Sequence, residues 1–203
     1  MRKYDAVFFD LDGTLSESGE GILWCVRRTI EDLKIVVPEN FRLESFIGPP
    51  LADSFYRLGL DDEKVKFGVK TYKSYYDTKG KYMNKAYDGI KELLERLREK
   101  GYKLGVATSK YELFARQIID NIGLLQYFDF VSGATANAER QKKIDVLNYG
   151  IKNLGATPEN SALIGDTKFD AEGARLCGCG FVGVLYGYGT VSYTHLTLPT
   201  NSR

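Results

Sequence analysis

The sequence predicts an α/β protein in which a doubly wound parallel sheet carries an inserted α-helical cap domain. Short apolar runs alternate with amphipathic helical segments over most of the chain, which is typical of parallel strands connected through helices. From Glu17 to about Thr78, by contrast, the periodicity is helical, with almost no strand signal. Because this block directly follows the first predicted strand, we expect it to form a separate lobe above the carboxyl edge of the sheet.

The first predicted strand covers residues 4–10 and contains the apolar run Ala6-Val7-Phe8-Phe9. The helical block that follows is interrupted by Gly48-Pro49-Pro50, a combination that breaks helices. Two stretches of the block place apolar residues on one helical face. These residues are Ile22, Val26, Ile30 and Leu33 in the first stretch, and Val65, Val69, Tyr72 and Tyr76 in the second.

Strands and helices alternate again after a predicted linker at residues 79–81. The first helix of this region ends at Gly101, a residue type that commonly ends helices. We predict, in chain order, a helix at 90–97, a strand at 103–108, a helix at 111–121, a strand at 128–132, a helix at 143–154, a strand at 161–165, a helix at 171–177 and a strand at 180–185. The predicted domains are a core at residues 1–15 and 85–190 and a helical cap at residues 16–84.

Composition narrows the function classes. The chain has 203 residues, enough for one α/β domain with an insert, and its 28 basic and 27 acidic side chains nearly balance. This balance argues against a nucleic acid polymer or an anionic membrane as partner but leaves small phosphorylated molecules open. We find no apolar run of membrane-spanning length and no signal peptide, so we expect a cytoplasmic protein. For Cys177 and Cys179, a packing role is favoured over half a metal site.

The last residues of the chain do not fit this pattern. Val191–Thr200 matches the translation of a transposon-end sequencing adapter, so we expect residues 191–203 to be a non-native tail. The only histidine, His195, lies in this segment and is given no catalytic role.

Two pairs of acids follow predicted strands. Asp10 and Asp12 end the first strand, and Asp166 and Asp170 follow the strand at 161–165. A simple turn would explain Asp12-Gly13 but not an acid at Asp10. Carboxylates at the carboxyl edge of a buried sheet need a cation or a proton to neutralise them. Oxygen ligands without histidine or cysteine favour a hard cation, so we expect Mg²⁺.

Polar residues at two further positions are candidates for binding an anion. The strand at 103–108 is followed by a turn, so Thr108 and Ser109 would place hydroxyl groups and amides at the same edge, although such a threonine is also a common helix cap. Lys142 and Lys143 begin the helix at 143–154, where a lysine could neutralise a phosphoryl group. A solvated basic turn is the ordinary alternative for these lysines.

Together these residues resemble the haloacid dehalogenase superfamily over nearly all of residues 4–190. The segment Asp10-Leu11-Asp12-Gly13-Thr14-Leu15 is similar to its first motif, Thr108 to its second, the lysine to its third and Gly165-Asp166-x-x-x-Asp170 to its fourth. Lys143 fits the third motif best by its spacing, with Lys142 as the alternative. The resemblance also implies a final strand and helix after Gly189, where this sequence continues into the adapter-like segment.

The resemblance implies phosphatase or mutase chemistry. Asp10 would be the nucleophile that forms an aspartyl-phosphate, and Asp12 would be the general acid–base. Asp10, the backbone carbonyl of Asp12 and Asp166 would hold Mg²⁺, supported by Asp170. Thr108, Ser109 and Lys143 would bind the phosphoryl group; these residues complete the list of predicted core site residues.

The helical insert resembles the small cap of the phosphoglycolate phosphatase and 5′-nucleotidase branch of that superfamily. Gly48, Pro49 and Pro50 would then face the substrate, although a plain interhelical turn would also explain them. We therefore expect a Mg²⁺-dependent phosphomonoesterase acting on a small molecule such as a nucleoside 5′-monophosphate or phosphoglycolate. A phosphoglucomutase-like or pyrophosphatase member of the same family is an alternative within enzymes. A receiver-type phospho-accepting signalling domain is the alternative outside them.

Overall fold

A five-stranded parallel sheet forms the centre of the molecule, in the order β5-β4-β1-β6-β7. The computed structural model describes residues 3–136 and 139–189. The strands are β1 (Ala6–Phe9), β4 (Lys103–Tyr111), β5 (Phe130–Ala134), β6 (Ser161–Gly165) and β7 (Gly180–Gly183). The predicted α/β class is confirmed, and β1, which precedes the first pair of acids, occupies the middle of the sheet.

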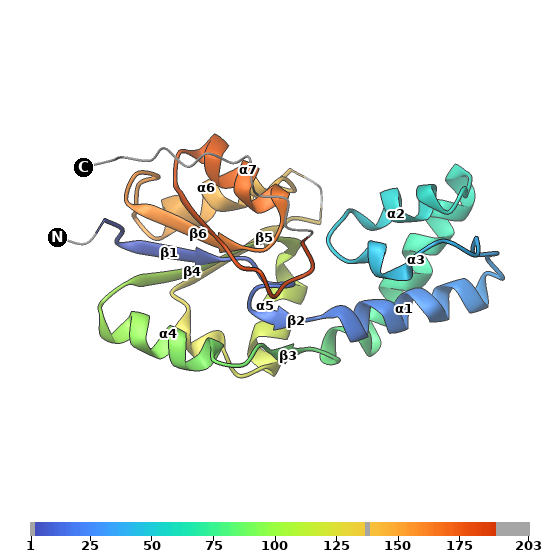
Figure 1. Cartoon of the computed structure of the whole chain (residues 1–203), viewed down its shortest axis with the longest axis horizontal. Helices are drawn as coiled ribbons and strands as arrows, with labels where there is room; N and C mark the ends of the chain where they lie inside the picture. The colour runs from blue at the N-terminus through green and yellow to red at the C-terminus, as the bar shows by residue number, and fades with distance from the viewer. Residues whose placement is uncertain (1–2, 137–138, 190–203) are drawn as a thin grey trace.

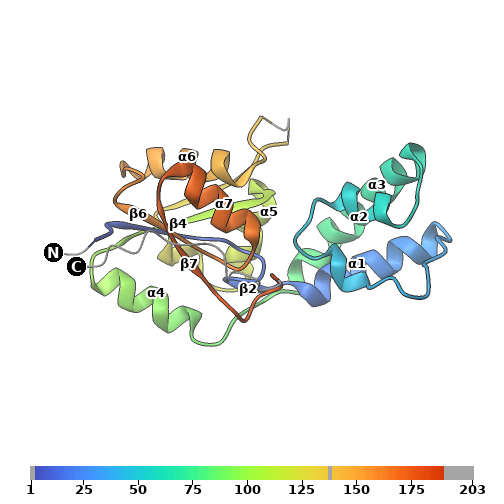
Figure 2. The same ribbon diagram turned by 45° about the horizontal axis from the view of Figure 1, so that its top comes forward.

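Helices cover both faces of this sheet. In Figure 1, α6 (Lys143–Asn153) and α7 (Lys168–Cys177) lie above it, and α4 (Ile90–Glu99) lies below it. Turning the molecule brings α6 and α7 forward and leaves α4 on the opposite side (Figure 2). The remaining helix of the core, α5 (Glu112–Asn121), packs in the same apolar cluster as α4.

Strand β1 is apolar on both sides because each side faces a layer of helices. Ala6 and Phe8 belong to an apolar cluster with α6 and α7, whereas Val7 and Phe9 belong to the cluster that includes α4 and α5. Successive side chains of a strand point to opposite faces, so an uninterrupted apolar run is what a doubly covered strand requires. This packing on both faces holds β1 in place up to Phe9, so that Asp10 comes directly after its last buried apolar residue.

The inserted helices form a lobe to one side of the sheet (Figure 1). The lobe contains α1 (Gly19–Asp32), α2 (Leu51–Arg57), α3 (Asp62–Thr78) and the 3-10 turns η1 (Leu43–Phe46) and η2 (Gly80–Tyr82). Its buried side chains, such as Phe55 and Val65, share one apolar cluster with Leu11 and Leu15 beyond the end of β1. The lobe therefore packs directly on the carboxyl edge of the sheet.

Two short strands connect the lobe to the sheet. Strand β2 (Ser16–Glu17) leads into the lobe, β3 (Lys85–Ala86) leads out of it, and the two pair antiparallel. The predicted boundaries at residues 15/16 and 84/85 fall beside this pair; the division into separate domains stays a prediction.

The structure differs from the prediction at element ends. Helix α7 begins at Lys168, three residues before the predicted start, because Thr167 and Asp170 form a reciprocal capping box. Strand β4 extends past Thr108 to Tyr111, and β7 ends at Gly183. The predicted tail at residues 191–203 lies outside the described residues. Among the helices that the structure describes, none has the length and apolarity needed to cross a membrane.

Candidate active site

Three buried aspartates meet at the carboxyl edge of the sheet. Asp10 follows β1, and Asp166 follows the adjacent strand β6, so the parallel pairing of these strands brings the two acids together. Asp170 joins them from the first turn of α7. One carboxylate oxygen from each residue lies within 4.8 Å of the others, and all three side chains are buried. The structure therefore brings together three of the four predicted acids.

Lys143 lies within this cluster, at the start of α6. Its Nζ atom is 2.6 Å from Asp10 Oδ1 and 2.7 Å from Asp170 Oδ1. The same ammonium donates to the carbonyl oxygen of Ala107 at 2.9 Å. Lys142, in contrast, is exposed. Of the two predicted lysines, only Lys143 contacts the acids.

The charges in the cluster do not balance. Burial raises the pKa of Asp10 to about 7, although the Lys143 ammonium acts to lower it. Burial likewise raises the pKa of Asp166, against backbone N–H groups that favour its ionised form. Burial acts to lower the pKa of Lys143, but the negative charges of Asp10 and Asp170 outweigh it and raise that pKa. The ammonium of Lys143 contacts two of the three carboxylates, those of Asp10 and Asp170, so three ionised aspartates carry more negative charge than this lysine can offset.

Local backbone structure holds Asp166 and Asp170 in place. Asp166 Oδ2 accepts hydrogen bonds from the backbone N–H groups of Tyr188 at 2.7 Å and Gly189 at 3.1 Å. Asp170 Oδ2 accepts from the backbone N–H and the hydroxyl of Thr167, as part of the capping box. Since Oδ2 of Asp170 is used for capping, its Oδ1 atom is the one that contacts Lys143.

Gly13 allows the first pair of acids to approach the second. Its φ of +85° is unfavourable for residues with a side chain, and a Cβ atom at this position would collide with the Asp166 carboxylate. Both conformation and space therefore require glycine directly after Asp12.

Asp12 has a lysine of its own, which sequence analysis missed. Lys110 Nζ lies 2.8 Å from Asp12 Oδ2 and donates a hydrogen bond to the Tyr76 hydroxyl on α3. Burial acts to lower the pKa of Lys110, but the negative charge of Asp12 and the hydrogen bond to the Tyr76 hydroxyl raise it. The sequence did contain a signal, because Lys110 follows Thr108 and Ser109 at the predicted edge. Those two residues were selected for their hydroxyl groups, and the lysine was passed over.

The hydroxyl candidates differ in environment. Thr108 is buried, and its Oγ1 atom accepts a hydrogen bond from the backbone N–H of Lys110 at 3.2 Å, whereas Ser109 is exposed. Thr108 thus stabilises the irregular last part of β4, which carries Lys110. Its predicted binding of a phosphoryl group, and that of Ser109, stay predictions.

The predicted cap residues lie apart from the acids. Gly48, Pro49 and Pro50 connect η1 to α2, and the φ of +102° at Gly48 explains why the turn contains glycine. None of the hydrogen bonds or ion pairs found among residues 3–136 and 139–189 joins them to the acidic cluster. In Figure 1, the segment leading into α2 projects from the lobe toward the sheet, so a role in substrate contact stays a prediction.

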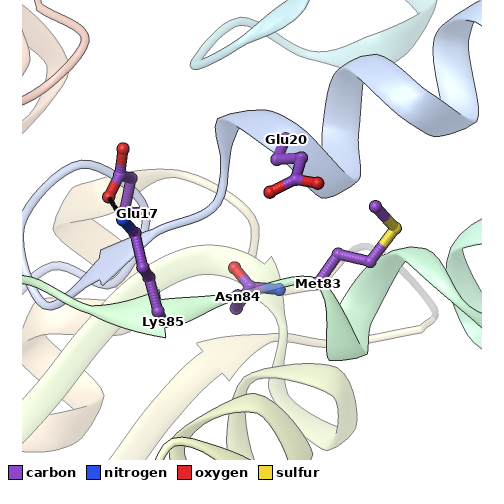
Figure 3. A pocket seen from close by; sticks show the side chains of 5 residues that line it. All are labelled: Glu17, Glu20, Met83, Asn84 and Lys85. Atoms are coloured by element: carbon purple, nitrogen blue, oxygen red, sulfur yellow. Dashed lines mark ion pairs between the residues drawn. The ribbon is translucent and has the colours of Figure 1, made fainter.

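A hollow lies where the linkers meet the lobe. Its walls are Glu17, Glu20, Met83, Asn84 and Lys85, where β2 and β3 meet the lobe (Figure 3). Lys85 Nζ is 2.9 Å from Glu17 Oε2, so this pair is internally neutralised. The charge pattern that calls for a ligand is therefore at Asp10, Asp166 and Asp170.

The donor set of the cluster fits Mg²⁺. Three carboxylates supply oxygen ligands alone, and their excess negative charge would be offset by a divalent cation. Such oxygen-only sites suit hard cations such as Mg²⁺, which keeps several of its own water ligands. Burial, with a smaller contribution from the negative charge of Asp170, raises the pKa of Asp10 although Lys143 opposes it.

Comparison with known proteins shows the family of the chain. A family model described as haloacid dehalogenase-like hydrolase matches residues 7–184. The chain is 36% identical to a 5′-nucleotidase of Pseudomonas aeruginosa, covering 98% of this chain and 90% of that protein. It is also 36% identical to the tyrosine-protein kinase PtkA of Mycobacterium tuberculosis, covering 96% of this chain but 66% of that protein, just under two thirds of its length. The solved structure of a haloacid dehalogenase-like family hydrolase from Streptococcus pneumoniae superposes with a TM-score of 0.86 at 34% identity, covering 94% of this chain and 89% of that one.

We expect Mg²⁺ to raise the melting temperature of the protein, because the cation binds the folded cluster and not the unfolded chain. At ten times its dissociation constant, the gain is about 1.4 kcal/mol, or about 3–6 °C for a chain of this size. Asp166→Asn should abolish most of the shift, whereas Asp88→Asn, at an exposed position, should retain it. Thermal unfolding across a Mg²⁺ titration measures this, and equal shifts in both variants would contradict the assignment.

We expect Asp10→Asn to stabilise the metal-free protein increasingly as the pH rises. The folded pKa of Asp10 is about 7, against an ordinary value of 3.8, so between these values the folded protein keeps a proton that the unfolded chain releases. The free energy of unfolding of the wild type therefore falls as pH rises from about 3.8 to about 7. The variant has no carboxyl group at this position, so its free energy of unfolding does not fall for this reason. Melting temperatures in chelator should diverge up to about pH 7 and then stay parallel. If the difference in melting temperature between Asp10→Asn and the wild type becomes smaller as pH rises, Asp10 is not held protonated by burial.

Proposed function

The chain belongs to the haloacid dehalogenase-like hydrolase family, and we propose that it is a Mg²⁺-dependent phosphomonoesterase that acts through an aspartyl-phosphate on Asp10. One observation carries the proposal. Three buried aspartates meet at the sheet edge, Lys143 contacts two of them, and their negative charge exceeds what this lysine supplies, which a divalent cation would offset. Attack of a carboxylate on a phosphate dianion needs positive charge nearby, because the two negative groups repel each other. A lysine and a divalent cation at this edge would supply that charge.

The proposed first step is transfer of the phosphoryl group to Asp10. The Asp10 carboxylate attacks phosphorus, and the bond from phosphorus to the ester oxygen breaks. Asp12 donates a proton to the leaving alkoxide, so that a neutral alcohol departs. Lys143 orients the Asp10 carboxylate and reduces its repulsion of the substrate.

The proposed second step returns the enzyme to its starting state. Asp12, now a carboxylate, takes a proton from water, whose oxygen attacks phosphorus. The acyl-phosphate bond breaks, Asp10 is released as a carboxylate, and inorganic phosphate departs. Bound Mg²⁺, held by Asp10, Asp166 and the backbone carbonyl of Asp12 with support from Asp170, would supply positive charge to the transferring oxygens.

The proposed substrate is a small phosphate monoester, either a nucleoside 5′-monophosphate or phosphoglycolate. The similarity to a 5′-nucleotidase over 90% of that protein supports the first. A mutase or a pyrophosphatase would use the same core and differ in what the helical lobe admits. The match to a hydrolase family over residues 7–184 argues against the receiver-type alternative.

A second candidate function is phosphoryl transfer to a tyrosine hydroxyl. It is favoured by one observation, the 36% identity to the tyrosine-protein kinase PtkA. In this case the acceptor in the second step would be a phenol instead of water. Incubation with ATP and Mg²⁺, followed by detection of phosphotyrosine on the chain, distinguishes this function from simple phosphate release.

We expect phosphate release in Mg²⁺ from a panel of nucleoside 5′-monophosphates, phosphoglycolate, sugar phosphates and pyrophosphate, with one class preferred in kcat/KM. Asp10→Asn should lower the rate by about a thousandfold or more, because no other group can accept the phosphoryl group. Chelation of Mg²⁺ should have a similar effect. Full activity of purified Asp10→Asn protein would exclude the covalent mechanism.

The two adjacent lysines provide a matched test of the site. Lys143→Met removes the ammonium that contacts Asp10 and should lower kcat by about 10²- to 10³-fold, the size expected for loss of one charge-stabilising donor. Lys142→Met removes an exposed lysine and should leave kcat within about twofold. Steady-state rates of both variants measure this, and the reverse order would assign the role to Lys142.

A further inference from the structure

Lys110 joins the sheet edge to the helical lobe through a single ammonium group. It lies near the end of β4, and its Nζ atom contacts Asp12 Oδ2 at 2.8 Å and the Tyr76 hydroxyl at 2.5 Å. Tyr76 belongs to α3, so the lysine contacts one residue from each part of the molecule. Only 12% of the Lys110 side chain is exposed, which keeps most competing water away.

The two oxygens of Asp12 have different surroundings. Oδ2 is held by Lys110, whereas Oδ1 is buried and has no hydrogen-bond partner among the described residues. Buried carboxylate oxygens are normally hydrogen-bonded, and the described part of the protein leaves this one open to a proton or a ligand. Fixing Oδ2 restricts rotation of the carboxylate and leaves Oδ1 as the atom available to give or take a proton.

Tyr76 is itself held firmly. Its side chain is 4% exposed, and its ring stacks on Tyr72 with centroids 5.6 Å apart and planes 12° apart. On its other side it contacts Phe114 of α5, with centroids 6.0 Å apart. The Lys110 ammonium also lies 4.6 Å from the centroid of the Tyr76 ring, within range of a cation–π contact. The lobe therefore supplies a rigid support for the lysine.

We propose that Lys110 is a positioning residue that holds the Asp12 carboxylate for proton transfer, and that Tyr76 of the helical lobe fixes Lys110 in that role. The proposal rests on the proposed function, in which Asp12 is the acid–base. Each aspartate of the Asp10-Leu11-Asp12 pair then has a separate lysine: Lys143 orients the nucleophile, and Lys110 orients the proton carrier. The lobe contributes to proton transfer through Tyr76, in addition to any contact with substrate.

The steps of p-nitrophenyl phosphate hydrolysis separate this role from a structural one. Nitrophenolate departs without needing a proton, so formation of the aspartyl-phosphate depends little on Asp12. Attack by water does need Asp12 to accept a proton. A misplaced Asp12 should therefore slow the second step selectively, and the phosphoenzyme should accumulate.

The experiment is rapid-quench hydrolysis of p-nitrophenyl phosphate in Mg²⁺ by the full chain. Lys110→Met should lower kcat by about a hundredfold and give a nitrophenolate burst approaching one per active site, with phosphate trapped on the protein. Tyr76→Phe removes only a hydroxyl group and should show the same pattern with a loss of about 2- to 10-fold. Lys110→Arg, which keeps the charge, should recover much of the activity lost in Lys110→Met.

Two controls accompany these variants. Asp12→Asn should accumulate the phosphoenzyme, which establishes that the assay detects it. Lys73→Met removes an exposed lysine from the same helix as Tyr76 and should behave as the wild type.

The proposal is overturned if Lys110→Met keeps kcat within about twofold of the wild type, or loses activity without a burst and without trapped phosphate. If Lys110→Met does not fold, Tyr76→Phe decides, because a wild-type rate with no burst would exclude the Tyr76 support. Absence of phosphate release by the wild-type protein on this substrate and on the panel above would instead overturn the proposed function.

Discussion

The structure depends on one electrostatic constraint, the burial of three carboxylates beside the ammonium of Lys143, which contacts two of them. Asp10, Asp166 and Asp170 are removed from water, and Lys143 cannot neutralise all of them. Leaving such charges unpaired in a folded protein is strongly unfavourable, so the surrounding chain must hold them in position. Backbone N–H groups from residues 188 and 189 and the capping box at Thr167 provide this support. The same excess of negative charge suits the site to a divalent cation.

The sheet makes this arrangement possible because it is packed on both faces. Phe8 and Phe9 point to opposite helical layers, and each is completely buried. Burial of side chains of this size contributes about 1.5–3 kcal/mol each, which helps to offset the cost of charges placed at the strand end. With β1 held between β4 and β6, the positions of Asp10 and Asp166 follow from strand register.

Much of the fold and part of the site could be predicted from the sequence. The spacing of apolar residues reflects which side chains are buried. It was therefore enough to predict the succession of strands and helices along the chain and the position of the helical insert. Lys143 could not be separated from Lys142 by pattern, since the choice depends on which side of the first turn of α6 faces Asp10. Lys110 was missed because its partners, Asp12 and Tyr76, are far away in the chain and meet only when the lobe packs on the sheet. The early start of α7 depends on a reciprocal cap between two side chains, which apolar periodicity does not reveal.

The pairing of β2 with β3 has a consequence for how such a protein can diversify. Ser16 faces Ala86 and Glu17 faces Lys85, so the chain leaves the core and re-enters it at neighbouring points. The ends of the inserted segment, residues 17 and 85, are paired strand neighbours, so the distance between them is as short as across a hairpin turn. Insertions of very different length are then accommodated at little cost in chain entropy. Evolution can exchange the lobe and retain the acidic cluster, provided that the replacement supplies a group that supports Lys110 as Tyr76 does.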